Sequence, residues 1–317
     1  MDKEIFVSVI IPVYGVEQYI ERCARSLFEQ TLNNVEFIFV DDCSPDKSIS
    51  ILNQVLQEYP DRIANTKILH HEFNQGLPQA RKTGFSRAIG QYVFQCDSDD
   101  WIDRNLLELM FLKAKDNNLD VVCCDCKNVY PNKYTITAAG YRTNIVDCIS
   151  DMMYRKMWWS LCNKMFRRAL LNNDICFPND AMGEDMCLCL QLMYYAKTIG
   201  YVKGVYYNYY INSNSIVQVI SKERCLQKYE QLSRNIHILN SFFNEKKQNE
   251  KWKKGLDYLS FYKSELLVPV LHDNEIRSIW NKANKGKSFW VFADRNVILK
   301  QRIKAFLIWI RLFRYLR

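Results

Sequence analysis

Four consecutive residues, Asp97-Ser98-Asp99-Asp100, place three carboxylates in one short segment of the chain. They follow the apolar run 92–96, which has the pattern of a buried strand, so we expect them in the turn where the chain leaves a sheet. Neighbouring carboxylates repel one another. Because hard divalent cations prefer carboxylate oxygens, a metal ion that carries a diphosphate would make this cluster favourable. The alternative interpretation is an ordinary acidic turn, whose carboxylates bond to its own backbone and to water.

Two further acidic pairs stand at the ends of predicted elements. Asp41-Asp42 follows a predicted strand, and Glu184-Asp185 begins a predicted helix. The carboxyl ends of parallel strands meet at one rim of a sheet, so we expect the first pair to lie near the 97–100 cluster. Each pair also has a structural interpretation, as turn residues before Ser44-Pro45 or as favourable charges at a helix start. The joint arrangement favours a functional site.

The elements that must position these acids alternate in type through the first 126 residues. Predicted strands span 7–11, 35–40, 67–69, 92–96 and 120–126, and predicted helices span 17–30, 47–59, 79–89 and 104–117. This alternation predicts an α/β fold with a doubly wound, mostly parallel sheet flanked by helices.

Beyond about residue 130 the alternation lapses. The pattern predicts helices over 161–171 and 184–196, a strand or hairpin over 201–210, and only helices from 221 onward. We therefore divide the chain into residues 1–126, 127–217 and 218–317, the last being a C-terminal helical region.

Several common nucleotide-binding signatures are missing from the sequence. It has neither a G-x-G-x-x-G motif after the first strand nor a P-loop motif, which weighs against dinucleotide and P-loop proteins. A nucleotidyltransferase would need a glycine-rich, basic loop at 12–17, where none occurs. Twelve cysteines include one C-x-x-C pair, Cys123 and Cys126, inside a predicted buried strand. We interpret them as small apolar side chains in a reducing cytoplasm rather than as zinc ligands or disulfides.

The net charge of +8 is concentrated at the C-terminal end of the chain. The last 20 residues contain six basic side chains and no acid, and without them 37 basic residues remain against 35 acidic ones. A nearly neutral body weighs against nucleic acid as a partner. The amino terminus does not resemble a signal peptide, and no apolar run reaches the roughly 20 residues needed to cross a bilayer.

The basic tail has the pattern of an amphipathic helix. On a helical wheel Lys300, Lys304, Arg311 and Arg314 fall within an arc of about 80°. An adjoining apolar face consists of Leu299, Ile303, Phe306, Ile310 and Phe313. Such a helix suits the surface of an anionic membrane, which predicts a peripheral protein at the inner face of the cytoplasmic membrane. Packing on the body, or on a second subunit of a homo-oligomer, is the alternative.

The chain resembles the family-2 glycosyltransferases of the GT-A fold over roughly residues 5–217. The resemblance rests on motifs that occur in the family's order and spacing: 7–14 (VSVIIPVY), 39–44 (FVDDCS), 74–81 (NQGLPQAR), 90–92 (GQY), 97–101 (DSDDW), 163–166 (NKMF) and 183–185 (GED). Two positions depart from the family's usual pattern. Gly15 and Lys82 stand where asparagine is common, and Lys82 bears on contacts to the diphosphate.

The resemblance implies a role for each acidic group. Residues 1–126 would bind the nucleotide sugar and 127–217 the acceptor. Pro12, Val13 and Tyr14 would line the nucleoside site, Asp42 would contact uracil, Arg81 would lie near the diphosphate, and Asp97 would face the ribose or the metal. Asp99, with Asp97, would bind Mn²⁺ or Mg²⁺, and Asp185, next to Glu184, would be the general base.

These roles imply an inverting, metal-dependent transfer of a sugar from a nucleotide donor, a UDP-sugar, to a glycan or lipid-linked glycan in surface-polysaccharide biosynthesis. A catalytically silent nucleotide-sugar-binding protein of the same fold is the alternative. The intact acids Asp97, Asp99 and Asp185 argue against it. No pattern in the sequence identifies the sugar or the acceptor.

Overall fold

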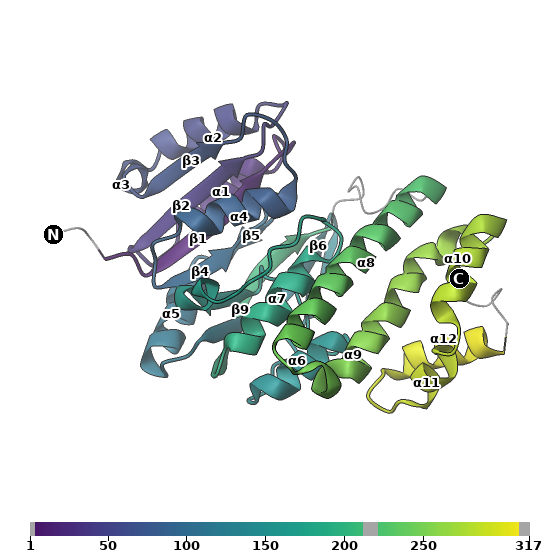
Figure 1. Ribbon diagram of the computed structural model, residues 1–317. Coiled ribbons are helices and arrows are strands. Elements are labelled where there is room, and N and C mark those ends of the chain that lie inside the picture. Colours follow the sequence, from purple (N-terminus) through teal and green to yellow (C-terminus); the bar gives the residue numbers. More distant parts are fainter. Residues whose placement is uncertain (1–3, 212–220, 311–317) are drawn as a thin grey trace.

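The computed structural model describes residues 4–211 and 221–310 (Figure 1). Over these residues one nine-stranded sheet carries helices on both faces, and a group of helices follows it. Eight strands lie in the order β3-β2-β1-β4-β8-β6-β9-β5, and β7 pairs with β6 outside this path. The predicted α/β class and the C-terminal helical region are therefore confirmed. The divisions at 126 and 217 stay predictions.

The first half of the sheet follows the predicted alternation closely. Its parallel strands are β1 (Val7–Val13), β2 (Val35–Asp41), β3 (Thr66–His70) and β4 (Tyr92–Gln95). Its helices are α1 (Ile20–Phe28), α2 (Ser48–Gln57), α3 (Pro60–Ile63), α4 (Leu77–Arg87) and α5 (Leu106–Asp116). All seven residues of β1 are buried, because helices cover both faces of the sheet at this strand.

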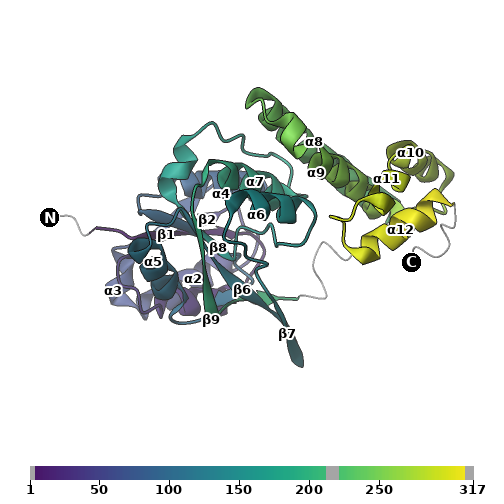
Figure 2. The same cartoon turned by 90° about the horizontal axis from the view of Figure 1, so that it is seen from below.

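The second half of the sheet mixes strand directions. β6 (Val121–Tyr130) and β9 (Ile199–Tyr210) are parallel to each other, whereas β5 (Trp101–Ile102), β7 (Lys133–Thr137) and β8 (Lys164–Arg167) pair antiparallel with their neighbours. Figure 2 shows β7 projecting from the body. Helices α6 (Ile145–Met153) and α7 (Glu184–Tyr195) pack on one face.

The helix predicted over 161–171 is wrong. The chain forms β8 there, followed by the short 3₁₀ helix η1 (Arg168–Asn172). β8 inserts between β4 and β6 and pairs antiparallel with both. The apolar spacing of the segment suits a helix, but the facing edges of β4 and β6 carry backbone N–H and C=O groups that need partners, and a strand between them supplies these. A short apolar run does not reveal these distant edges.

Buried Lys164 fixes the start of β8. Its ammonium group donates to the carbonyl oxygens of Trp158 at 2.6 Å and Ser160 at 2.8 Å, and to the side chain of Asn163 at 2.7 Å. Asn163 in turn donates to the carbonyl of Cys124 on β6 at 2.9 Å. A charged group without exposure needs such a complete set of partners.

The C-terminal region consists of helices, as predicted, throughout its described residues. They are α8 (Lys222–Glu245), α9 (Asn249–Tyr262), the 3₁₀ helix η3 (Lys263–Val270), α10 (Asn274–Asn284), α11 (Ser288–Ala293) and α12 (Leu299–Trp309). α8 packs on α7 and shares its hydrophobic core, so the region begins as part of the body. No helix among the described residues combines the length and apolar character that crossing a membrane requires.

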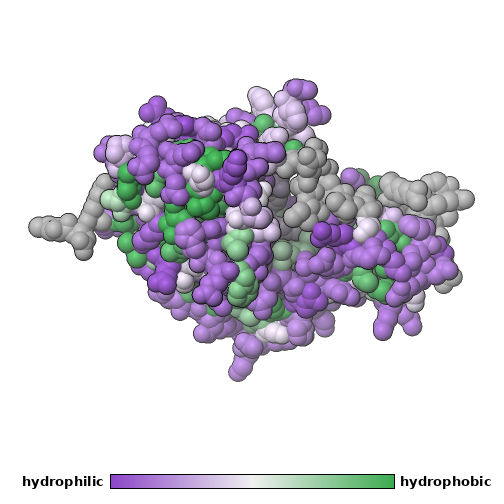
Figure 3. Space-filling view, turned by 90° about the horizontal axis from the view of Figure 1, so that it is seen from above, coloured by the Kyte–Doolittle hydropathy of each residue, from purple (hydrophilic) through white to green (hydrophobic). Residues whose placement is uncertain are grey.

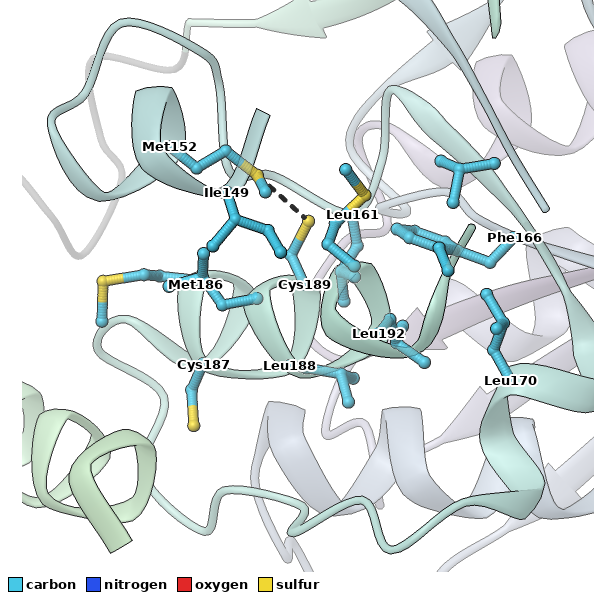
Figure 4. Packing of buried hydrophobic residues seen from close by; sticks show 14 of the residues in the cluster. Ile149, Met152, Leu161, Phe166, Leu170, Met186, Cys187, Leu188, Cys189 and Leu192 are labelled. Atoms are coloured by element: carbon cyan, nitrogen blue, oxygen red, sulfur yellow. Dashed lines mark hydrogen bonds between the residues drawn. The ribbon is translucent and has the colours of Figure 1, made fainter. Parts of the chain in front are cut away.

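Hydrophobic side chains fill a core on each face of the sheet. One core joins β1 to α1, α2 and α5, and the other joins the sheet to α4, α6, α7, α8 and α9. Figure 4 shows part of the second core, where the Cys189 thiol lies 3.8 Å from the Met152 sulfur. Ten of the twelve cysteines are buried, which agrees with their interpretation as apolar filling.

Hydrophilic residues dominate the face shown in Figure 3.

Candidate active site

The candidate nucleoside residues lie at the carboxyl ends of β1 and β2. These strands are parallel and pair Val13 with Asp41, so the two chain ends emerge side by side. The backbone N–H of Asp42 donates to the carbonyl oxygen of Val13 at 3.0 Å. Pro12 and Val13 are buried, whereas Tyr14 is 49% exposed. The structure therefore brings the predicted nucleoside-site residues together, while their contact with a base stays a prediction.

The carboxylate of Asp42 organises the loop that follows β3. It accepts hydrogen bonds from the backbone N–H groups of Gln75 and Gly76, both at 2.8 Å, and pairs with the His71 ring at 2.7 Å. Gly76 has φ +87°, a conformation that favours glycine. Asp42 is only 3% exposed. A uracil N3–H would thus have to share an oxygen that already accepts hydrogen bonds.

Asp100 serves the structure of the acidic turn. It is fully buried and accepts hydrogen bonds from the Tyr207 hydroxyl at 2.6 Å and from the backbone N–H of Tyr210 at 2.7 Å. The same hydroxyl accepts a hydrogen bond from the backbone N–H of Asp97 at 3.0 Å. Two residues of β9 therefore hold the turn after β4. The sequence offers no signal for this, because Tyr207 lies 110 residues from Asp97.

Asp97 and Asp99 are the two acids of the turn that fit a metal ion. Burial and the nearby charge of Asp97 raise the pKa of Asp99 to about 6, and a cation would relieve both effects. Among residues 4–211 and 221–310, no group of three or more His, Cys, Asp or Glu side chains could hold a metal. A two-carboxylate set nevertheless suits Mg²⁺ or Mn²⁺, since substrate phosphates and water commonly complete the coordination of such ions.

The back of the acidic turn rests on Arg22 of α1. Its guanidinium donates to the carbonyl oxygen of Asp99 at 2.7 Å and stacks 3.9 Å from the centre of the Trp101 ring. Burial lowers the pKa of Arg22 despite the opposing charge of Asp100. Sequence reasoning missed this residue, because an arginine in an ordinary amphipathic helix carries no distinguishing pattern.

Arg81 of α4 joins three carboxylates of the site. Its guanidinium is 3% exposed, donates to Asp97 at 2.7 Å, and pairs with both Glu184 and Asp185. Burial opposes the charge on Arg81, but the charges of Asp185, Glu184 and Asp97 outweigh it and raise its pKa well above the ordinary value. The structure thus connects the acidic turn directly to the acids that begin α7. The predicted contact of Arg81 with a diphosphate stays a prediction.

Glu184 and Asp185 differ in accessibility. Burial raises the pKa of Glu184 to about 8, and its side chain is 5% exposed. Burial also raises the pKa of Asp185, but its side chain is 27% exposed. Its second oxygen accepts a hydrogen bond from the Ser160 hydroxyl at 3.2 Å, a contact that no sequence pattern announces. Of the two acids, Asp185 is the one that a substrate hydroxyl can reach.

This arrangement can do two things chemically. Asp97 and Asp99 can hold a cation at the carboxyl end of β4, beside the nucleoside residues on β1 and β2. Asp185 can accept a proton nearby, because Arg81 holds it in the same constellation as Asp97. Open α/β sheets bind their ligands in the crevice beyond the carboxyl ends of the strands, and these acids lie at that rim.

The sequence profile of the family named Glycosyl transferase family 2 matches residues 8–182. EpsH of Bacillus subtilis (strain 168) is 31% identical over 79% of this chain and 73% of its own length. The poly(ribitol-phosphate) beta-glucosyltransferase of Bacillus spizizenii is 31% identical over 65% of this chain, but this covers only 32% of that protein. The chain belongs to glycosyl transferase family 2 and is a glycosyltransferase.

Solved structures support the fold assignment. The 1–349 segment of TarS from S. aureus in complex with UDP has a TM-score of 0.64 and 22% identity, over 98% of this chain and 88% of that one. A mannosyltransferase from Pyrobaculum calidifontis in complex with GDP-Man and Mn²⁺ has a TM-score of 0.59 and 16% identity, over 99% and 86%. The predicted GT-A fold is confirmed.

Proposed function

We propose that this glycosyltransferase moves a sugar from a UDP-sugar to a glycan or lipid-linked glycan in surface-polysaccharide assembly, with inversion at the anomeric carbon. One observation carries the proposal: the buried guanidinium of Arg81 joins Asp97 of the acidic turn to Asp185 of α7. A donor held at the turn would then present its anomeric carbon within reach of a base. If the acidic turn and the start of α7 had unrelated roles, no side chain would need to connect Asp97 with Asp185.

The donor binds at the rim formed by β1, β2 and β4. Pro12, Val13 and Tyr14 line the nucleoside site, and Asp42 recognises the uracil ring. The choice of uracil is supported by the UDP and UDP-GlcNAc complexes of TarS, a protein of the same fold. Asp97 and Asp99 would hold Mn²⁺ or Mg²⁺, which would neutralise the charge that grows on the departing diphosphate. Arg81 keeps Asp97 oriented.

Asp185 acts as the general base. Its carboxylate removes the proton from the attacking acceptor hydroxyl on the face opposite the leaving group. The hydrogen bond from Ser160 and the contact with Arg81 fix its orientation. Glu184 is more deeply buried and serves mainly as a second partner of Arg81. Positioning therefore contributes more than basicity at this site.

The acceptor belongs to a cell-surface polymer. Relatives whose names refer to such polymers support this class, among them a teichoic acid biosynthesis protein of Bacillus subtilis and a poly(ribitol-phosphate) glucosyltransferase. We place the protein at the inner face of the cytoplasmic membrane, where nucleotide sugars and a lipid-linked acceptor would meet.

Release of nucleoside diphosphate from a panel of donors tests this function. UDP-glucose, UDP-GlcNAc, UDP-galactose and GDP-mannose are each incubated with the full chain and Mn²⁺. We expect slow hydrolysis of one UDP-sugar, its loss with excess EDTA and its return with added Mn²⁺. Preferential release of GDP would contradict the assignment of Asp42, and activity unaffected by EDTA would contradict the metal.

The variant Asp99→Ala tests the metal assignment within the same assay. Loss of one cation ligand at the diphosphate should cost several kcal/mol of transition-state stabilisation, or about a thousandfold in rate. Asp116→Ala is the matched control, because Asp116 is an exposed acid at the end of α5. Equal activity of the two variants would contradict the role of Asp99.

A further inference from the structure

Helix α12 has apolar side chains on two opposite sides. Gln301, Ala305 and Ile308 are buried against the core of the C-terminal helices. In contrast, Leu299, Ile303 and Ile310 are 67%, 51% and 38% exposed. At about 100° per residue, these three fall within an arc of about 40°, opposite the buried side. These three residues of the apolar face predicted from the sequence therefore point outward, and a different face packs. Phe313, Arg311 and Arg314 of the predicted tail helix lie outside the described residues.

The neighbouring helix α11 extends this outward face. Phe289 is 54% exposed, and its ring centre lies 5.2 Å from that of Trp309, which is 50% exposed. We call the five residues Phe289, Leu299, Ile303, Trp309 and Ile310 the outer face. α10, α11 and α12 lie at the end of the molecule away from β3 (Figures 1 and 2), where a large surface could approach them.

Positive charge flanks the outer face. Lys300 and Lys304 follow Leu299 and Ile303 directly in sequence, and Lys300 is exposed. Lys304 forms an ion pair with Glu265 at 3.0 Å, so its charge is partly neutralised within the molecule. The last 20 residues of the chain hold six basic side chains and no acid. A second copy of this chain would meet the outer face with the same positive charge, whereas anionic lipid would complement it.

We propose that the outer face docks on an anionic lipid surface. α12 then lies in the plane of the interface, with Leu299, Ile303 and Ile310 among the upper acyl chains and Lys300 at the headgroups. Trp309 suits the boundary between headgroups and acyl chains, where tryptophan gathers, and Phe289 suits the apolar side of this boundary. The docking rests on the proposed function in one respect: a lipid-linked acceptor would explain why the enzyme binds a membrane.

Point substitutions test the docking better than truncation. Removing α12 would also take Ala305 and Ile308 out of the C-terminal core and disturb the fold. We therefore compare the full chain with the double variant Leu299→Glu, Ile303→Glu. Leu112→Glu is the matched control, because Leu112 is 43% exposed on α5. Sedimentation is measured with vesicles of phosphatidylcholine alone and with vesicles containing phosphatidylglycerol, at low and high salt.

The full chain and the control should sediment with the anionic vesicles at low salt and much less with neutral ones. The double variant should bind the anionic vesicles at least about tenfold more weakly. It loses two apolar side chains that would enter the lipid, and its two new carboxylates are repelled by the anionic headgroups. Its circular dichroism should be unchanged. Equal binding of the double variant overturns the proposal, as does a full chain that ignores the vesicles. A dimer broken by the double variant would assign the face to a second copy instead.

Release of UDP without vesicles, measured on the same preparations, separates this proposal from the proposed function. A chain that binds vesicles but hydrolyses no UDP-sugar would refute the function and leave the docking intact. A chain that hydrolyses UDP-sugar but does not bind vesicles would refute the docking and leave the proposed function intact.

Discussion

Arg81 holds three carboxylates of the site together. The buried guanidinium and the three carboxylates stabilise one another only as a set, because removal of the guanidinium would leave like charges facing one another in a poorly solvated place. The resemblance to the family predicted that Arg81, Asp97 and Asp185 act in one site, and the structure brings the three side chains together. The resemblance could not indicate that the arginine bridges the other two, since their contacts span 16 and 104 residues.

Arg81→Met should destabilise the protein and abolish sugar transfer. Breaking a buried charge pair on one side typically costs about 3–5 kcal/mol, because the remaining charges lose their partner. Arg87→Met is the control, since Arg87 is an exposed residue of the same helix. Urea unfolding of both variants measures the difference. If the Arg81 variant unfolds at the same urea concentration as the control, the three ion pairs contribute little.

The raised pKa of Asp99 predicts a pH dependence of metal binding. A carboxyl group with a pKa of about 6 holds its proton to higher pH than an ordinary aspartate, so the metal-binding form is lost as the pH falls through 6. We expect Mn²⁺ affinity of the donor-free protein to be constant above pH 7 and to fall below pH 6. Titration of Mn²⁺ by electron paramagnetic resonance measures this. An affinity that stays constant down to pH 5 would contradict the raised pKa of Asp99.

At the scale of elements, the parallel strands could be predicted from short apolar runs, and β8 could not. β1 and β2 are buried along their whole length, which makes each an apolar run that stands out locally. β8 forms only because β4 and β6 both offer it an open edge. β5 has two residues and β7 is exposed along most of its length, so neither has an apolar pattern to detect.

The close approach of α4 to β1 makes Gly84 a sensitive position. A methyl group added there would lie 2.4 Å from a side-chain carbon of Ile10, which is fully buried. Gly84→Ala should therefore cost about 1–3 kcal/mol of stability by overpacking, although alanine favours a helix. Thermal unfolding should show a lower midpoint than Arg87→Ala, an exposed substitution on α4. A higher midpoint for Gly84→Ala would mean that α4 can move away from β1.

At the scale of the whole molecule, α8 connects the C-terminal region to the loop that precedes Glu184 and Asp185. The side chain of Asn235 donates to the carbonyl oxygens of Asp180 and Met182 at 2.8 and 2.9 Å, and Arg234 pairs with the carboxylate of Asp180. These contacts hold the loop directly before Gly183, whose φ is +79°. The loop leads into α7, so the C-terminal helices support the position of Asp185.

Asn235→Ala should slow transfer more than it weakens donor binding. The two carbonyl groups would lose a buried donor, at a cost of about 1–3 kcal/mol, and the start of α7 would become less well fixed. Asn240→Ala on the same helix is the control, because Asn240 donates to a backbone carbonyl of its own helix, that of Ile236, at 2.9 Å. The measurement is kcat alongside the affinity for UDP. Equal kcat values would show that α8 does not support the site.

We propose Asp185, held by Arg81 beside the acidic turn, as the base of the transfer reaction. The most direct test compares Asp185→Asn with Glu184→Gln, measuring UDP-sugar affinity by calorimetry and transfer to an acceptor extract. Asp185→Asn should bind the donor nearly as well as the unaltered chain and transfer sugar about 10²–10⁴ times more slowly, with Glu184→Gln less affected. Transfer that survives in Asp185→Asn and fails in Glu184→Gln would contradict the assignment and make Glu184 the base.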